Sequence, residues 1–178
     1  TRLLDLGIEP FLVASSLTGV LAQRLARRPC PTCAVASMPA ADIIEKVGGA
    51  DRLPADARWV AGTGCEECRQ TGYKGRMAIH ELLLINDTVR ELISRRAPDH
   101  AIREAGRKTG MRTMIEDAIS KAAQGITTLE EISRVVPTDE LQRSEPAHAA
   151  AEAPEARGET AGGERPVEAN GKILVVED

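Results

Sequence analysis

The chain has 178 residues, enough for one ordinary domain with some chain to spare. Its only aromatic residues are Phe11, Trp59 and Tyr73, so a core must be built from Leu, Ile, Val, Met and Ala. The net charge is −4, but residues 1–143 carry 20 Lys and Arg against 19 Asp and Glu. This near-neutral balance argues against a nucleic-acid partner, which usually requires a basic patch.

Nothing in the sequence approaches the roughly 18 consecutive apolar residues of a membrane-spanning helix. We therefore expect a soluble, cytoplasmic chain with no direct membrane insertion. The sequence opens at Thr1 without an initiator Met and stops within an apolar run that ends in Glu177 and Asp178. We interpret it as a fragment of a longer protein.

The first 30 residues predict two short helices and a strand. Apolar residues at helical spacing fill residues 1–18 and are interrupted by Gly7 and Pro10, which separates two short helices. From Gly19 to Arg27 the side chains alternate between two faces, as in a strand.

The middle of the chain is poorly periodic. Between Cys30 and Cys68 only residues 40–47 favour a short helix, and a loop of this length needs a staple. Arg76 to Ile85 then predicts a buried strand.

Helical spacing dominates from Asp87 to Val136 and predicts three or four packed helices. Local signals mark where these helices begin and end. They are the N-cap at Asn86-Asp87, Asp99 after Pro98, Gly110, and a capping box from Thr128 to Glu131.

Residues 144–170 have the composition of a disordered linker, with eight Ala, six Glu, three Gly and three Pro among 27 positions. Such a segment buries too little apolar surface to offset about 1 to 2 kcal/mol of backbone entropy per residue. The apolar run 172–176 then begins a new strand.

All four cysteines fall into two Cys-x-x-Cys pairs. The pairs are Cys30 with Cys33 and Cys65 with Cys68, separated by 31 residues. Two thiolates three positions apart grip one ion, and a second pair completes the Cys₄ shell of structural zinc. Because sulfur fills every position, no open site remains for catalytic water, and we predict a structural metal. Disulfide formation and redox chemistry are the alternatives.

The residues around the cysteines suit the tight turns, or knuckles, that each Cys-x-x-Cys pair would form around an ion. Pro31 and a set of glycines let the backbone turn sharply around an ion, and these glycines are Gly62, Gly64, Gly72 and Gly75. His80 and His100 are not predicted to be ligands, because each lies in a predicted element and the metal shell is already full. His148 lies in the linker.

Several short motifs, taken in order, resemble the C-terminal region of the ATPases that drive type II secretion and type IV pilus assembly. They are Thr1–Phe11 (TRLLDLGIEPF), Gly19–Leu25 (GVLAQRL), Cys30–Cys33 (CPTC), Gly64–Cys68 (GCEEC), Thr71–Arg76 (TGYKGR), Ile79–Leu83 (IHELL) and Gly125–Glu131 (GITTLEE). The resemblance covers about residues 1–136, and the order of the motifs is more specific than any one of them.

In that family, homo-hexameric rings of RecA-like domains use ATP and Mg²⁺ to move an inner-membrane platform protein, extruding pilin or pseudopilin subunits. The resemblance implies a cytoplasmic location, peripheral to the inner membrane. No Gly-x-x-x-x-Gly-Lys-Ser/Thr loop occurs in this sequence, so no catalytic or nucleotide-binding residue is assigned, and this piece alone should not hydrolyse ATP. The nucleotide site would lie before Thr1.

The resemblance implies an α+β fold with five segments. They are 1–29, the end of a RecA-like P-loop ATPase core; 30–75, an inserted tetracysteine zinc element; 76–137, a strand with a small helical bundle; 138–170, a disordered linker; and 171–178, the start of another domain.

The last eight residues, GKILVVED, resemble the first strand of a two-component receiver domain. In such domains, paired acids at the end of this strand help to hold Mg²⁺ beside a phosphorylated Asp. The resemblance implies this role for Glu177 and Asp178. A generic buried strand that ends in acids is the alternative.

Two other functions fit parts of the sequence. A zinc-ribbon module for nucleic acid would suit the cysteines, but it is disfavoured by the near-neutral charge. Residues 65–75 resemble one unit of the cysteine-rich repeats of DnaJ-type chaperones, although only one unit is complete here.

Overall fold

The computed structural model describes residues 2–137 and 172–177. Its helices are α1 (Arg2–Asp5), α2 (Pro10–Ser16), α3 (Ala41–Lys46), α4 (Asp87–Ser94), α5 (Asp99–Lys108), α6 (Met114–Ala123) and α7 (Leu129–Val135). Its strands are β1 (Leu17–Pro29), β2 (Ala34–Ala36), β3 (Val60–Gly62), β4 (Tyr73–Leu84) and β5 (Lys172–Glu177). Two single 3₁₀ turns cover Ala50–Arg52 and Glu66–Cys68. The fold therefore combines helices with two small sheets, one of three strands and one of two.

The predicted elements of the folded part are confirmed. The two N-terminal helices, the helix near residues 40–47, both long strands and four later helices are all present. The short strands β2 and β3, which pair with each other, were not predicted. Each has only three residues, too few for a period-2 pattern to be recognised.

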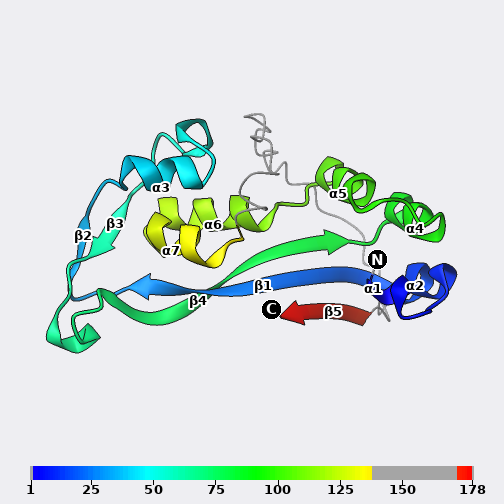
Figure 1. Ribbon diagram of the computed structural model, residues 1–178, viewed down its shortest axis with the longest axis horizontal. Coiled ribbons are helices and arrows are strands. Elements are labelled where there is room, and N and C mark those ends of the chain that lie inside the picture. The colour runs from blue at the N-terminus through cyan, green and yellow to red at the C-terminus, as the bar shows by residue number, and fades with distance from the viewer. Residues whose placement is uncertain (1, 138–171, 178) are drawn as a thin grey trace, which may run out of the picture.

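The two longest strands form a twisted antiparallel ribbon along the length of the molecule (Figure 1). Their register runs from Gly19 opposite Leu84 to Arg27 opposite Arg76, and after an irregularity Pro29 lies opposite Tyr73. Residues directly opposite each other share a face of the ribbon. On one face, Ala26 and Ile79 are completely buried.

Helices α6 and α7 cover that buried face, and α5 and α4 lie toward the end of the ribbon where β1 begins (Figure 1). The main core combines Ala26 and Ile79 with apolar residues of both covering helices, including Ile115, Leu129 and Ile132. A second cluster joins α2 to α4 and α5. Within the described ranges, no helix has the length and apolar character that crossing a bilayer requires.

Helix α6 also occupies the free edge of β4. The backbone N–H of His80 donates a hydrogen bond of 2.8 Å to Asp117 Oδ2. Lys121 Nζ donates to the carbonyl oxygen of Ala78 at 2.9 Å. Because unpaired edge groups invite pairing with other strands, these two side chains protect the ribbon where no neighbouring strand covers it.

The excursion between the cysteine pairs folds back on the helices. Val47, just after α3, is fully buried against α6 and α7. Ile43, Ile44, Leu53 and Trp59 pack against the same cluster. The sequence predicts a metal staple for this loop, and the structure adds a second, apolar anchor.

The helix ends follow most of the predicted signals. Asn86 Oδ1 accepts the N–H of Val89, α5 begins at Asp99, and Gly110 has a φ of 92°. The predicted box from Thr128 to Glu131 is only half formed: Thr128 Oγ1 accepts the N–H of Glu131 at 3.1 Å. The carboxylate of Glu131 does not return to the cap, because two arginines hold it.

A complete capping box, not predicted, stands at the start of α6. The Glu116 N–H donates to Thr113 Oγ1, and the Thr113 N–H donates to Glu116 Oε2 at 2.8 Å.

The predicted strand at the C-terminal end is also present. β5 pairs in parallel with β1, from Lys172 beside Leu17 to Glu177 beside Gln23. The predicted linker 138–170, His148 within it, and Asp178 lie outside the described residues.

The complete burial of the Ile79 side chain yields a first prediction. Ile79→Ala should lower the free energy of unfolding by about 2 to 5 kcal/mol, because it leaves a cavity between β4 and the covering helices. Urea unfolding followed by circular dichroism measures this. Leu82→Ala on the same strand is the matched control, since Leu82 is 43% exposed. Equal losses for the two variants would contradict the assigned core.

Candidate metal centre

The four cysteines meet at one end of the β1–β4 ribbon. Cys30 directly follows β1, and Cys33 directly precedes β2. Cys65 is the N-cap of the 3₁₀ turn Glu66–Cys68, and Cys68 is its last residue. The two knuckles, residues 30–33 and 65–68, thus face each other.

The sulfur atoms have the spacing of a tetrahedral metal site. All four Sγ atoms lie within 4.8 Å of one another. The Sγ–Sγ separations are 3.8 Å for Cys30 to Cys65, 3.9 Å for Cys33 to Cys68 and 3.7 Å for Cys65 to Cys68. A tetrahedron with Zn–S bonds of about 2.3 Å has edges of about 3.8 Å. The observed spacing fits one ion held by four thiolates.

The same distances argue against disulfides. A disulfide joins its sulfurs at about 2.05 Å, and all four cysteines are free. Three of them are buried and Cys65 is half-buried. Among the described residues, these four form the one cluster of three or more His, Cys, Asp or Glu side chains that could hold a metal.

Backbone N–H groups prepare part of the site for negative charge. Burial raises the pKa of the Cys68 thiol. Hydrogen bonds from the N–H groups of Cys65 and Gly72, each 3.2 Å long, together with those from the Cys65 and Cys33 thiols, outweigh burial and lower the pKa to about 6. Burial likewise opposes ionisation of Cys30, and the N–H groups of Thr32 and Cys33 turn the net change in its pKa downward.

Cys65 behaves in the opposite way. The N–H of Cys68 lowers the pKa of Cys65, but burial and the three neighbouring cysteines together raise it to about 11. Four thiolates this close repel one another, so full ionisation requires a cation among them. The site can therefore bind a cation and is poorly suited to remain empty and ionised.

Glu67 makes two exposed polar contacts, one to the first knuckle and one to β4. Glu67 Oε2 accepts a hydrogen bond of 3.0 Å from Thr32 Oγ1 and one of 2.8 Å from Lys74 Nζ. Thr32 belongs to the first knuckle and Glu67 to the second, so their contact closes the site across its surface. The Lys74 ammonium lowers the pKa of Glu67 and keeps it charged.

Two of the predicted glycines are required by a close approach of the backbone. A Cβ on Gly62 would lie 1.9 Å from the carbonyl oxygen of Gly72, and one on Gly72 would lie 2.5 Å from that of Gly62. Gly64, Gly72 and Gly75 do have positive φ, as the turn argument predicts. For Gly62 that reason is wrong: it ends strand β3, and its missing side chain makes room for the backbone of Gly72.

The other predicted site residues lie elsewhere or outside the described side chains. His80 is on β4 and His100 is on α5, and neither belongs to the cysteine cluster. Glu177 is the last residue of β5, so its place in a strand is confirmed, whereas the predicted Mg²⁺ role of Glu177 and Asp178 stays a prediction.

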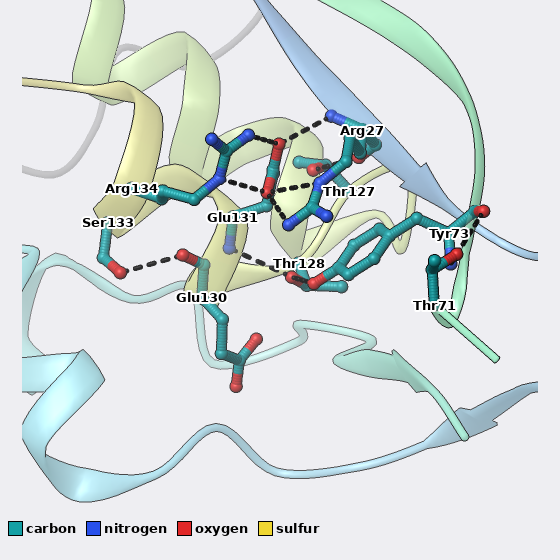
Figure 2. A network of polar contacts seen from close by, with 9 residues as sticks. All are labelled: Arg27, Thr71, Tyr73, Thr127, Thr128, Glu130, Glu131, Ser133 and Arg134. Atoms are coloured by element: carbon teal, nitrogen blue, oxygen red, sulfur yellow. Dashed lines mark hydrogen bonds and ion pairs between the residues drawn. The ribbon is translucent and has the colours of Figure 1, made fainter. Parts of the chain in front are cut away.

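A buried carboxylate on α7 was missed by sequence reasoning. Glu131 on α7 is 1% exposed and is held by two arginines (Figure 2). Arg27 donates to it from the backbone N–H at 3.0 Å and from Nε and Nη2 at 2.9 and 2.7 Å. Arg134 donates from Nε and Nη2 at 3.0 and 2.6 Å. All of its acceptor capacity is therefore used by charged or backbone donors.

The cause of the shifted pKa of Glu131 is a balance of opposing effects. Burial raises this pKa, while the hydrogen bonds from Arg134 and Arg27 and the charge of Arg27 lower it from 4.5 to about 2. Glu131 thus stays ionised inside the fold and ties α7 to β1.

Tyr73, the first residue of β4, joins this network. The guanidinium carbon of Arg27 lies 4.1 Å from the centre of the Tyr73 ring, a cation–π contact. The Tyr73 hydroxyl lies 2.9 Å from Thr128 Oγ1, the N-cap of α7 (Figure 2). The one available signal in the sequence is that Tyr73 is the only Tyr in a chain with three aromatic residues.

Fold and site together define a small α+β domain with a four-cysteine centre compatible with metal binding. The family model described as "Type II/IV secretion system protein" matches residues 1–134. That match covers most of the 178 residues, so the chain belongs to this family.

Individual relatives agree. The Type IV pilus assembly ATPase PilB of Thermus thermophilus is 46% identical over 132 residues, covering 74% of this chain and 15% of the relative. The Type II secretion system protein HxcR of Pseudomonas aeruginosa is 47% identical over 135 residues, covering 76% and 25%. For the Type II secretion system ATPase E of Vibrio cholerae the identity is 44%, covering 76% and 26%. The chain thus spans about a quarter or less of the length of these relatives.

The pKa of Glu131 predicts acid lability. Because its folded pKa is depressed to about 2 from 4.5, its contribution to stability is complete above about pH 4.5 and is lost as the pH falls toward 2. The shift corresponds to about 3 kcal/mol of unfolding free energy. Urea unfolding at a series of pH values measures it.

Glu131→Gln removes the titrating group and should be less stable than the unmodified chain at pH 7, with a shallower loss of stability between pH 5 and 2. Glu130→Gln, on the same helix but outside the arginine network, is the matched control and should retain the full slope. Equal slopes for Glu131→Gln and the unmodified chain would contradict the assigned role.

Proposed function

We propose that this chain is the zinc-stapled C-terminal accessory region of a motor ATPase that drives type II secretion or type IV pilus assembly. The observation that carries the proposal is the tetrahedral cysteine cluster within a chain of the type II/IV secretion family. The region supplies no chemistry of ATP hydrolysis, because its sequence holds no phosphate-binding loop. It acts as a structural and coupling element.

Zinc is the metal that the donor set favours. Four thiolates in tetrahedral arrangement suit Zn²⁺, and a shell complete in sulfur is typical of structural sites. Cys30, Cys33, Cys65 and Cys68 would hold the ion. Bound there, it would neutralise the thiolates and fix the two knuckles against each other.

The motor role rests on the relatives. Two of those described above are named as ATPases, one for pilus assembly and one for type II secretion. By their resemblance, the intact parent would be a cytoplasmic homo-hexamer that binds ATP and Mg²⁺ through an upstream RecA-like core and acts on an inner-membrane platform protein. Residues 1–29 would be the end of that core.

The shape suits transmission of movement. The β1–β4 ribbon connects the cysteine knuckles at one end with α1, α2, α4 and α5 at the other (Figure 1). Its covering helices and its protected edge make it stiff. A displacement at one end would therefore be carried to the other.

The metal assignment predicts the behaviour of a Cys65 variant. Purified protein should contain one zinc per chain by elemental analysis, whereas Cys65→Ser should bind zinc at least tenfold more weakly, since it leaves three thiolates. Cys65→His supplies a nitrogen ligand and should keep stoichiometric zinc. Absence of zinc from the unmodified chain would overturn the assignment, and stoichiometric iron would change the identity of the metal.

The motor role is tested in a relative. Residues 1–137 of this chain can replace the matching segment of the Pseudomonas aeruginosa relative, to which they are 47% identical. We expect the hybrid to support secretion, the hybrid with Cys65→Ser to lose most of it, and the hybrid with Cys65→His to recover it. Full secretion by the Cys65→Ser hybrid would contradict a role for the metal element in the motor.

A further inference from the structure

We infer that occupancy of the metal site is communicated to helix α7 through Tyr73 and Arg27, so that the ion controls how firmly α7 is docked on the ribbon. This inference rests on the proposed metal site. It adds that the ion does more than close its own loop.

The first step leads from the sulfurs to the start of β4. The N–H of Gly72 donates to Cys68 Sγ at 3.2 Å. The carbonyl oxygen of the same Gly72 accepts the N–H of Cys30 at 2.8 Å. Gly72 is thus bound to one cysteine of each knuckle, and its position depends on both.

The residue that follows Gly72 is Tyr73, so the knuckles place this side chain directly. Thr71 adds a further tie, because its hydroxyl donates to the carbonyl oxygen of Cys68 at 2.6 Å and accepts the N–H of Tyr73 at 3.3 Å. A shift of the second knuckle would therefore move the Tyr73 backbone.

The second step leads from Tyr73 to the N-terminus of α7. The hydroxyls of Tyr73 and Thr128 lie 2.9 Å apart, and Thr128 caps the helix by accepting the N–H of Glu131. The capping hydroxyl is thus shared between the helix and the first residue of β4. Loss of an N-cap destabilises a helix, so a shift of Tyr73 that disturbs Thr128 would weaken the start of α7.

The third step runs along β1 in parallel with the second. Arg27, three residues before Cys30, lies over the Tyr73 ring and binds the Glu131 carboxylate. Its carbonyl oxygen also accepts a hydrogen bond of 2.9 Å from Thr127 Oγ1. Arg27 on β1 and Tyr73 on β4 therefore both bind the N-terminal end of α7 (Figure 2).

Because residues of both β1 and β4 bind the start of α7, an ion that orders the knuckles stabilises its docking. The linkage is reciprocal: a substitution that uncouples α7 must weaken metal binding by the same factor by which the metal strengthens the docking. One lost hydrogen bond of this kind changes an equilibrium by about threefold to tenfold.

The experiment measures hydrogen exchange of the full chain with zinc bound and after zinc is removed by a chelator. In the unmodified chain, removal of zinc should raise amide exchange in α7 by about threefold to tenfold and leave α4 unchanged. Tyr73→Phe keeps the ring under Arg27 but removes the hydroxyl. In this variant α7 should exchange faster with zinc bound, zinc removal should add less, and zinc affinity should fall by the same factor.

Ser94→Ala is the matched control, since it removes a hydroxyl that bonds within α4. It should change neither zinc affinity nor the response of α7. Equal effects of Tyr73→Phe on α7 with and without zinc, at unchanged zinc affinity, would mean that Tyr73 only packs and would overturn the coupling. A chain that binds no zinc overturns the metal site as well, whereas zinc binding without any response of α7 overturns the coupling alone.

Discussion

The antiparallel pairing of β1 with β4 positions both the apolar core and the four cysteines. Its register sets Arg27 opposite Arg76 and, after the irregularity, Pro29 opposite Tyr73. The chain that leaves β1 at Cys30 therefore starts beside the chain that enters β4 from Gly72. A slip of one residue would put Ala26 and Ile79 on opposite faces of the ribbon, so that only one of them could face the helices, and it would displace the two knuckles relative to each other. Core and metal centre depend on the same alignment.

Most ion pairs of the described residues are exposed, but the carboxylate of Glu131 is buried. Glu131 is a fully buried carboxylate, and such a group is tolerated only when its partners replace water completely. Arg27 and Arg134 do so while remaining partly exposed, with side chains 43% and 59% accessible. The cations thus keep much of their hydration, which makes this pair less costly than one buried on both sides. Removal of either arginine would leave the carboxylate short of donors.

Much of the fold could be predicted from local patterns in the sequence. Periodicity located the helices and both long strands, and the two Cys-x-x-Cys pairs predicted the cluster that the four cysteines form. These features depend on residues close together along the chain. The network around Glu131 depends on residues 104 positions apart, which no local pattern reveals. The Thr128 to Glu131 spacing even suggested a different role, because a Glu at that position usually caps its own helix.

The short strands and the role of Gly62 could not be predicted from the sequence for a related reason. β2 and β3 pair with each other across the whole excursion between the knuckles, and three residues of each suffice because the cysteines fix their ends. Gly62 meets Gly72 only after that pairing is formed. Tertiary proximity, rather than intrinsic preference, decides both features.

The two anchors of the excursion between the cysteine pairs hold different parts of it. The cysteines close its base, where the knuckles leave the ribbon, whereas Val47 and Trp59 fix its far part on α6 and α7. Helix α7 packs against the apolar anchor directly and is joined to the strands that lead to the cysteines through Tyr73 and Arg27. Apolar packing alone would leave the helix free to slide, since it is not directional. The hydrogen bonds to Thr128 and Glu131 are directional and fix the position of α7 along the ribbon. A polar network therefore joins the strands that lead to the cysteines to a helix that is otherwise held by aliphatic side chains.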